Sequence, residues 1–195
     1  MQITAVLSSS RRIALLGGSL IFACTLAAAA QETIDATAMG TSTQLGKNVS
    51  VKLIIERWST KEDQKTLADA FKAAQNQGLV NALEKMKPVG RIQIPGTLGY
   101  DLAYAISVPT TTGRTVRFVT NRKIGFGEAY RNTQSQAYNL TGGQINMVDQ
   151  DNKKSAGVLY PAAQLVINKD GDLQIELRKN PWKLVNIIVR GKVEQ

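Results

Sequence analysis

The chain of 195 residues contains no histidine, and its one cysteine is Cys24. Without an imidazole group there can be no Ser-His-Asp triad, no histidine ligand for zinc and no histidine base. The sequence also has no Ser-x-x-Lys spacing and no Gly-x-Ser-x-Gly segment, the patterns of two other kinds of serine catalytic site. We therefore predict no catalytic residue, no metal ligands and no cofactor, and favour a protein that is not an enzyme.

Residues 1–30 have the order of a secretory signal peptide. A polar start ends in two arginines, an apolar run covers residues 13–26, and four alanines precede Gln31. This run is shorter than the roughly 20 apolar residues that a membrane-spanning helix needs. We predict removal of residues 1–30, export to the periplasm or out of the cell, and no transmembrane segment in the mature chain. In an alternative interpretation, Ile21–Cys24 is a lipoprotein processing site and Cys24 carries a lipid anchor.

Removal of residues 1–30 would take away two of the 24 basic residues, none of the 15 acidic ones, and the cysteine. The mature chain would then have no disulfide and would depend on its own core, for which about 165 residues suffice. Its remaining basic excess favours an anionic component of the cell envelope as a partner. We do not expect nucleic acid, because export separates the chain from it.

The mature chain has mostly the period-two pattern of half-buried strands. Residues 31–48, rich in Thr, Ser, Gly and Ala, predict a flexible leader, and a single domain follows over residues 49–195. Alternation begins at Val49 and returns in several segments after Pro88, with turn residues between them. The clearest hairpin runs from Tyr100 to Thr120, and Lys179–Pro181 predicts a further turn.

One helical segment interrupts the strands. Two pairs, Ser59 with Glu62 and Thr60 with Asp63, have the spacing of a capping box, which satisfies free N–H groups at the start of a helix. Apolar residues then recur at helical spacing on both sides of Gly78, until Pro88 ends the pattern. We predict a helical hairpin over about residues 60–87, inserted after the first strand.

These elements predict an α+β fold. Short connections require antiparallel neighbours, because a parallel pair needs a long crossover. We expect a mainly antiparallel curved sheet or small barrel of about eight strands, with the helical hairpin packed on it.

Two groups of residues are candidates for ligand binding. Tyr100, Tyr104 and Phe118 could line an apolar cavity inside a small barrel, or fill its core themselves. Period two places Tyr100 and Tyr104 on one face of their strand, with small residues on the other. Arg117 and Arg122 belong to a basic cluster that could bind an anion or remain a solvated surface. The cluster consists of Arg114, Arg117, Arg122, Lys123 and Arg131.

Two other interpretations stay open. The apolar stripe of Leu67, Phe71 and Leu83 could meet a partner protein, which would make the chain a structural or interaction component of the envelope. Asp101 and Glu128 could form the carboxylate pair of a hydrolase if the fold brings them together.

Four segments resemble parts of small bacterial proteins that carry signal peptides and have no assigned activity: Gly90–Ile92, Gly99–Ala105, Phe118–Arg122 and Pro161–Ala163. The resemblance implies bacterial export and a shared fold, and transfers no catalytic residue. Together with the residue patterns it leads us to expect an exported binding module for a small apolar ligand or an anionic envelope component. The sequence leaves the oligomeric state open.

Overall fold

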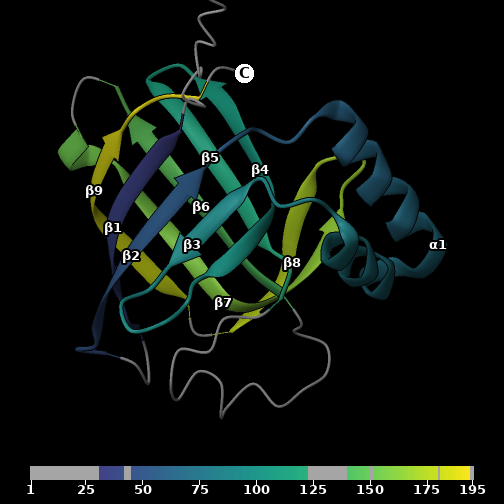
Figure 1. The fold of residues 1–195 in the computed structure, drawn as a ribbon, viewed down its shortest axis with the longest axis horizontal. Coiled ribbons are helices and arrows are strands. Elements are labelled where there is room, and N and C mark those ends of the chain that lie inside the picture. Colours follow the sequence, from purple (N-terminus) through teal and green to yellow (C-terminus); the bar gives the residue numbers. More distant parts are fainter. Residues whose placement is uncertain (1–30, 42–44, 123–139, 150–151, 180, 194–195) are drawn as a thin grey trace, which may run out of the picture.

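The computed structural model describes residues 31–41, 45–122, 140–149, 152–179 and 181–193, and the predicted signal peptide lies outside these ranges. Within them the chain forms an antiparallel barrel with one long helix on its side (Figure 1). Its first strands are β1 (Glu32–Met39) and β2 (Asn48–Ile55), which precede the helix α1 (Lys61–Lys85). After the helix come β3 (Gly90–Gln93), β4 (Tyr100–Thr110), β5 (Gly113–Thr120), β6 (Leu140–Val148), a short 3-10 turn η2 (Asn152–Lys154), β7 (Ala156–Ile167), β8 (Leu173–Lys179) and β9 (Trp182–Arg190).

Eight strands close the barrel in the order β6, β5, β4, β3, β2, β1, β9, β7, and pairing of β7 with β6 completes the circle. The prediction of an α+β fold with a small antiparallel barrel is therefore confirmed, as is the β4–β5 hairpin. Closure removes most exposed strand edges, which explains how so many short strands form one compact unit. No helix in the described ranges combines the length and the apolar character that a membrane-crossing helix needs.

Strands β8 and β9 lie end to end along β7. Ala162 pairs with Lys179, and Leu159 pairs with Trp182 in the same register. The chain thus keeps its direction from β8 into β9, and the predicted turn at Lys179–Pro181 is wrong. Proline has no N–H to donate to a ladder, so Pro181 separates two strands rather than reversing the chain. As a result, β8 and the second half of β7 extend beyond the barrel.

The prediction of a flexible leader at residues 31–48 is wrong, because Glu32–Met39 of this segment forms strand β1. It pairs with β2 on one side and with β9 on the other, and Ile34, Ala36 and Ala38 point into the barrel. Its outward residues are Thr33, Asp35 and Thr37, and threonine is enriched in strands although it also occurs in loops. The helix therefore follows the second strand, not the first.

Apolar side chains from all eight strands fill the barrel. Trp182, Phe118, Leu53 and Ile92 are each no more than 2% exposed. Phe118 lies directly over Gly143 of β6, where an added Cβ would stand 2.3 Å from the phenyl Cζ. The barrel interior is thus a packed core, as in other small barrels.

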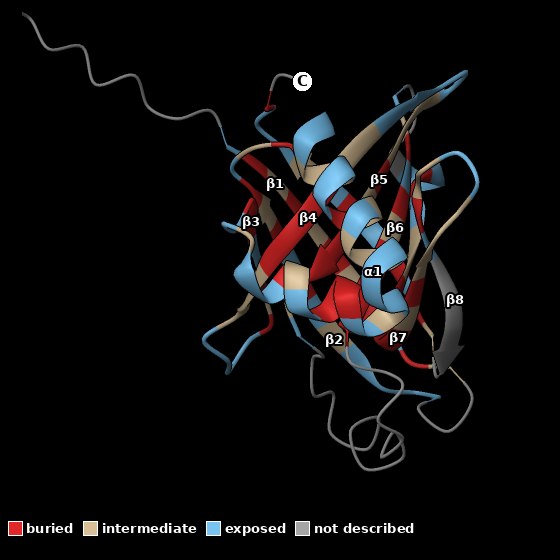
Figure 2. Cartoon of the chain, turned by 90° about the vertical axis from the view of Figure 1, so that its right-hand side faces the viewer, coloured by how far each residue is buried: buried red, intermediate tan, exposed pale blue. Residues whose placement is uncertain are grey.

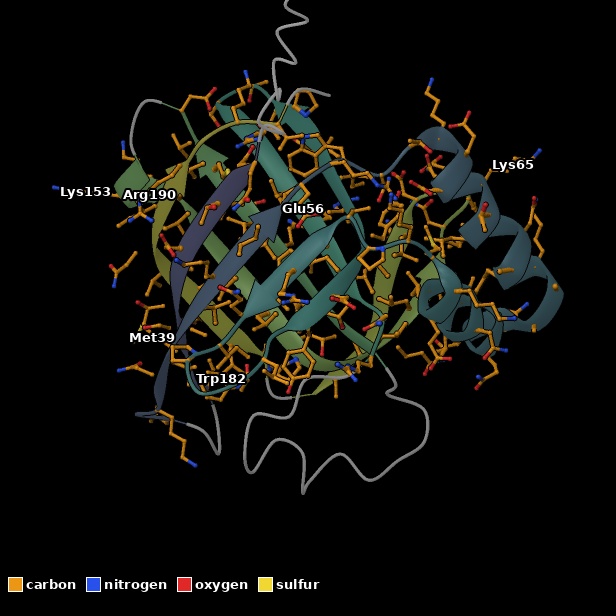
Figure 3. All side chains as sticks on the ribbon, in the orientation of Figure 1. Met39, Glu56, Lys65, Lys153, Trp182 and Arg190 are labelled. Carbon is orange, nitrogen blue, oxygen red and sulfur yellow. The ribbon has the colours of Figure 1, made fainter. Side chains whose placement is uncertain are left out.

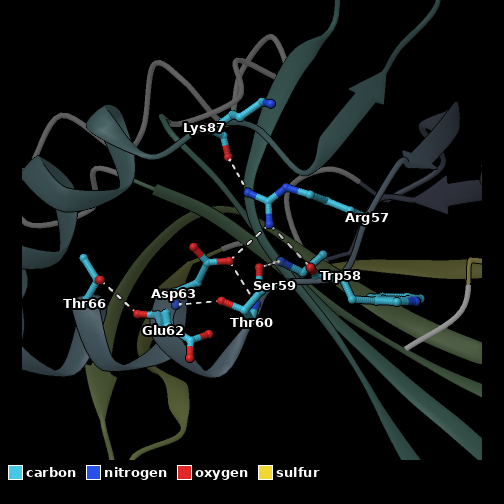
Figure 4. Close-up of polar contacts among 9 residues, drawn as sticks. Arg57, Trp58, Ser59, Thr60, Glu62, Asp63, Thr66 and Lys87 are labelled. Atoms are coloured by element: carbon cyan, nitrogen blue, oxygen red, sulfur yellow. Dashed lines mark hydrogen bonds and ion pairs between the residues drawn. The ribbon is translucent and has the colours of Figure 1, made fainter. Parts of the chain in front are cut away.

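Of the two capping boxes that the sequence allows, the helix begins with the one formed by Thr60 and Asp63. The Thr60 hydroxyl accepts a hydrogen bond from the Asp63 N–H at 3.1 Å, and the Asp63 carboxylate accepts one from the Thr60 N–H at 2.9 Å (Figure 4). Arg57 reaches the same carboxylate at 3.2 Å and the Lys87 carbonyl at 3.2 Å. Since Arg57 precedes the helix and Lys87 follows it, these contacts hold both ends of α1 at the barrel.

A sharp kink at Ala74 and Gln75 divides α1. Gln75 has a φ of 50°, a conformation that residues with a side chain rarely adopt. The second half bends back so closely that a Cβ on Gly78 would stand 2.0 Å from the Ala70 carbonyl oxygen. The expected hairpin is thus a single helical element with one kink, and its break lies at Gln75 rather than at Gly78.

Replacement of Gln75 by glycine is expected to stabilise the protein. A side chain at this φ costs about 1–3 kcal/mol, and glycine avoids most of that cost. Urea unfolding of Gln75→Gly should therefore show a gain of about 1 kcal/mol after the entropy of the unfolded glycine is included. Gln77→Gly, the matched control in regular helix, should lose about 0.5–1 kcal/mol. A loss in both variants would mean that the kink holds no backbone strain.

A second apolar core lies between α1 and the outside of the barrel (Figure 2). Leu67, Leu79 and Leu83 of the helix are no more than 1% exposed and contact outer side chains of β4 to β8. A bulge at Ala103 places Leu102 and Ala105 inside the barrel and Ala103 and Tyr104 outside. The predicted alternation that put Tyr100 and Tyr104 on one face is therefore wrong.

Candidate functional site

Three of the five predicted ligand-binding residues border one groove on the outer face of the barrel, which has a volume of about 310 Å³. They are Tyr104, Arg117 and Phe118, but the ring of Phe118 packs in the barrel interior, so only Tyr104 and Arg117 belong to the outer face. The other two of the five are elsewhere: the Arg122 guanidinium lies over the Tyr100 ring, 5.4 Å from its centroid. Tyr100 packs against the interior core and Tyr104 belongs to the outer one. The predicted single cavity of Tyr100, Tyr104 and Phe118 is therefore wrong, because the bulge separates the two tyrosines.

Strand register builds the groove. Two rows of side chains cross β4, β5, β6 and β7 on the outer face of the barrel. The first row is Tyr104, Val119, Gly142 and Tyr160; the second is Ile106, Arg117, Gln144 and Val158. Gly142 has no side chain, so the first row is open between its two tyrosines. Leu165 of β7 and Leu173 and Gln174 of β8 line the groove from the extension beyond the barrel.

Among the described residues that line the groove, Arg117 is the one that carries a charge. Its Nε is fully buried, and in the part of the chain that the structure describes this atom has no hydrogen-bond partner. Its neighbours in the row, Ile106 and Gln144, bring no charge. A buried nitrogen without a partner costs free energy, which an anionic ligand could recover by accepting its hydrogen bond.

Tyr104 is the second donor at the groove. It is 2% exposed, and burial, followed by the negative charges of Asp172 and Asp63, raises its pKa to about 12. The Arg117 charge acts in the opposite direction and is the smallest of these influences. The phenol therefore stays protonated at neutral pH and can donate a hydrogen bond, while it is a weak candidate for a base or a nucleophile.

A short hydrogen-bond network orients the polar side of the groove. The Asn146 Oδ1 accepts hydrogen bonds from Thr115 Oγ1 at 3.0 Å and from Gln144 Nε2 at 3.1 Å. With its amide nitrogen turned toward Asn146, Gln144 directs its carbonyl oxygen elsewhere. The polar groups thus gather on the side of Arg117, and the apolar side chains Leu165 and Leu173 lie on the side of β8.

Sequence reasoning missed the half of the groove that β6, β7 and β8 supply. Tyr160, Val158 and Leu173 lie more than 35 residues from Arg117 along the chain. They meet it because β5 pairs with β6 and β6 with β7. Alternation marks each of these residues as facing one side of its own strand, but it does not indicate which strands are neighbours.

The predicted basic cluster does not form one surface. Arg114 is directed to Glu32 inside one end of the barrel and lies 5.9 Å from the Trp58 ring centroid, whereas Arg117 lies in the groove and Arg122 on Tyr100. Lys123 and Arg131 are outside the described residues. Arg114, Arg117 and Arg122 therefore lie in three separate environments. They do not form one extended basic surface.

The other interpretations find little in the described structure. Asp101 forms an ion pair with Arg91 at 3.6 Å, and Glu128 lies outside the described residues. The stripe proposed for a partner protein contacts the barrel instead, since Leu67 and Leu83 are buried and Phe71 packs against the same core. Among the described residues no three Asp, Glu or Cys side chains gather as a metal site would require.

The fold and the groove define a closed antiparallel barrel with a small amphipathic site on its outer face. No protein-family model, no curated protein and no solved structure matches the chain. The chemistry of the groove is therefore the basis on which a function can be proposed.

Proposed function

We propose that this chain is an exported, non-catalytic binding protein of the bacterial envelope, and that its ligand is a small amphipathic anion. The anionic group binds Arg117, and the apolar part lies along the groove toward Leu165 and Leu173. The observation that carries this proposal is the buried Arg117 Nε, which has no hydrogen-bond partner among the described residues, in a groove whose described lining contains no carboxylate.

The charge of the ligand follows from Arg117. A guanidinium group keeps its proton at all ordinary pH values and presents several donors in a fixed plane, a geometry that suits carboxylate, sulfonate and phosphate oxygens. Nearby, the protonated Tyr104 hydroxyl offers one more donor, and no described residue accepts a hydrogen bond from it. Two donors without partners beside a groove favour a ligand rich in acceptors.

The walls of the groove indicate the apolar part of the ligand and its size. Ile106, Val119, Val158 and Leu165 present aliphatic surface, and Tyr104 and Tyr160 present ring faces and edges. Ligand sites usually have volumes of about 300–1,000 Å³, so a groove of about 310 Å³ suits a small molecule rather than a long chain. The filled barrel interior supports the same placement, because apolar side chains already occupy the space inside.

Export is the second part of the proposal. It is supported by the polar, apolar and small-residue order of residues 1–30. The described barrel contains no cysteine and is compatible with export, because a fold without a disulfide tolerates either redox environment. The ligands that an exported protein meets are those of the envelope and of the surrounding medium.

The test uses 1-anilinonaphthalene-8-sulfonate as an amphipathic anion and N-phenyl-1-naphthylamine as its uncharged analogue. Both dyes fluoresce more strongly in an apolar site, and they differ in the sulfonate. Arg117→Met keeps most of the side-chain length and removes the charge. Loss of a charged hydrogen bond costs about 1.5–3 kcal/mol, so we expect sulfonate affinity to fall about tenfold or more, with amine affinity little changed.

Arg122→Met is the matched control, because Arg122 is stacked on Tyr100 away from the groove. It should bind both dyes as the unmodified chain does. Urea unfolding of both variants checks that neither loses its fold, since partly unfolded proteins also bind the sulfonate dye. Equal sulfonate affinity in Arg117→Met and in the unmodified protein would contradict the proposal.

A further inference from the structure

One wall of the groove belongs to the part of the sheet that lies outside the closed barrel. Leu165 of β7 and Leu173 and Gln174 of β8 form it, and we call these three residues the outer wall. In the part of the chain that the structure describes, β8 pairs with β7 alone. A ribbon of two strands is only marginally stable by itself. The position of the outer wall therefore depends on what holds this ribbon.

Helix α1 holds the ribbon at its turn. The Gln64 Nε2 donates hydrogen bonds to the Gly171 carbonyl at 2.9 Å and to the Asp172 Oδ1 at 3.3 Å. Both acceptors lie in the β7–β8 turn, directly before Leu173 of the outer wall. The next residue of the helix, Lys65, points away from the barrel (Figure 3). The first half of α1 thus turns Gln64, and not its charged neighbour, toward the ribbon.

The second half of α1 holds the ribbon at Leu165. The Asn76 Oδ1 accepts a hydrogen bond from the Leu165 N–H at 3.2 Å. Leu165 lies beyond the last pair of β7 with β6, which is Ala163 with Leu140, and at a shift in the register of β7 with β8. A bulge disrupts the ladder locally, and the backbone N–H there still needs an acceptor. Asn76 supplies it directly after the kink at Gln75.

Apolar packing links the same wall to the helix. Leu165 and Leu173 line the groove and also belong to the core beneath α1. They are 1% and 9% exposed, and the helix contributes Leu67 and Leu79 to that core. Since such cores are close-packed, the two leucines cannot shift toward a ligand or away from it without a change in the packing of α1.

We infer that α1 positions the apolar side of the ligand site, with Gln64 and Asn76 as the two positioning residues, and that a bound ligand in turn holds α1 on the barrel. This inference rests on the proposed function. Such coupling is reciprocal. It acts on the apolar part of the ligand, because Arg117 lies on β5 within the closed barrel. Among the described residues that line the groove none belongs to α1, so both residues act through the outer wall.

The first test measures the affinity of Asn76→Ala for the sulfonate dye and for the uncharged amine dye. Alanine favours a helix more than asparagine does, so α1 itself is not weakened. The Leu165 N–H loses its acceptor, which disfavours the docked outer wall roughly tenfold. Only molecules with the wall in place bind well, so affinity for both dyes should fall by the same factor, about three- to tenfold. Arg117→Met, in contrast, should lower affinity for the sulfonate alone.

Three further variants separate positioning from general damage to the helix. Gln77→Ala removes an exposed hydrogen bond to Asn81 at 2.9 Å from the same half of α1 and should leave both affinities unchanged. Asn76→Asp keeps the Oδ1 acceptor and should keep amine affinity, which a new negative charge does not oppose. Gln64→Ala, at the other end of the outer wall, should reproduce the loss seen with Asn76→Ala.

The second test needs no ligand. Hydrogen exchange is followed by NMR for the β8 amide protons that bond to β7. These protons are not bonded to Asn76, so their exchange reports movement of the ribbon and not the loss of that one bond. Asn76→Ala should raise their exchange rates about tenfold, and Gln77→Ala should not. In the unmodified chain, bound amine dye should slow exchange at Leu79 of α1.

Three results would overturn the inference: unchanged affinity for both dyes in Asn76→Ala, a loss confined to the sulfonate, or unchanged β8 exchange in that variant. Failure of the unmodified chain to bind either dye would instead contradict the proposed function. In that case faster β8 exchange in Asn76→Ala would still support the positioning role of α1, and unchanged exchange would still contradict it.

Discussion

Arg114→Met is expected to lower the free energy of unfolding by about 3–5 kcal/mol, because it leaves a buried carboxylate without its partner. Glu32 is 0% exposed at the start of β1. Both of its oxygens accept hydrogen bonds from Arg114 of β5, one of them at 3.1 Å from Nη1. A loss of this size would remove a large part of the 5–15 kcal/mol that keeps an ordinary domain folded.

The position of the pair explains why the loss should be large. Glu32 and Arg114 point inward at the end of the barrel where β1 begins and β4 turns into β5, and the Arg114 guanidinium lies over the Trp58 ring. The Trp58 Nε1 donates a hydrogen bond to the Val193 carbonyl at 3.0 Å, so the last described residues cover this end. Little water can reach the carboxylate that Arg114→Met would leave behind.

Two further variants separate the ion pair from the space it fills. Glu32→Leu/Arg114→Met removes both charges and should recover most of the loss, since apolar replacements of buried pairs are often neutral. Arg190→Met breaks the pair with Asp35, which lies at the surface with the arginine 61% exposed, and should cost less than about 1 kcal/mol. Urea unfolding measures all three. A loss under about 1 kcal/mol in Arg114→Met would show that solvent reaches Glu32.

Alternation of apolar and polar residues predicts some strands of the barrel and their buried faces, and fails for others. Alternation in β2, β4 and β5 predicts strands because side chains on one side of each strand contact the core. It fails at β1, where the inward residues are Ile34, Ala36 and Ala38 and two alanines give little hydrophobic contrast. It also fails at Ala103, because a bulge adds one residue and moves Tyr104 to the opposite face. Bulges depend on both strands of a ladder, so one strand's sequence does not reveal them.

For the candidate site, the sequence predicts which types of residue take part, but it does not predict which of them lie next to one another. Arginine and tyrosine are identified because they offer donors and apolar surface, and Tyr104, Arg117 and Phe118 do border one groove. Tyr160 and Leu173 join them through strand pairing over long sequence distances, which alternation does not encode.

At high pH, Tyr104 is expected to make the protein less stable than its Tyr104→Phe variant. The folded protein holds the phenolic pKa at about 12, chiefly through burial, whereas an unfolded chain releases that proton near pH 10. Stability from this group is fully present below pH 10 and falls as the pH rises toward 12. A pKa that is about two units higher in the folded state contributes about 2.7 kcal/mol to the free energy of unfolding. About 2 kcal/mol of this contribution is lost by pH 11.5.

Urea unfolding of both proteins between pH 8.5 and 11.5 measures this difference. At pH 8.5 the two should differ by less than about 1 kcal/mol, because the Tyr104 hydroxyl has no hydrogen bond to a described residue to lose. Above pH 10 the unmodified chain should lose stability more steeply, and phenolate absorbance at 295 nm should show one tyrosine fewer titrating late in the variant. Parallel stability curves would mean that the hydroxyl is hydrated. In that case water already occupies the position where Tyr104 would donate to a ligand, and anion binding in the groove would depend on Arg117 alone.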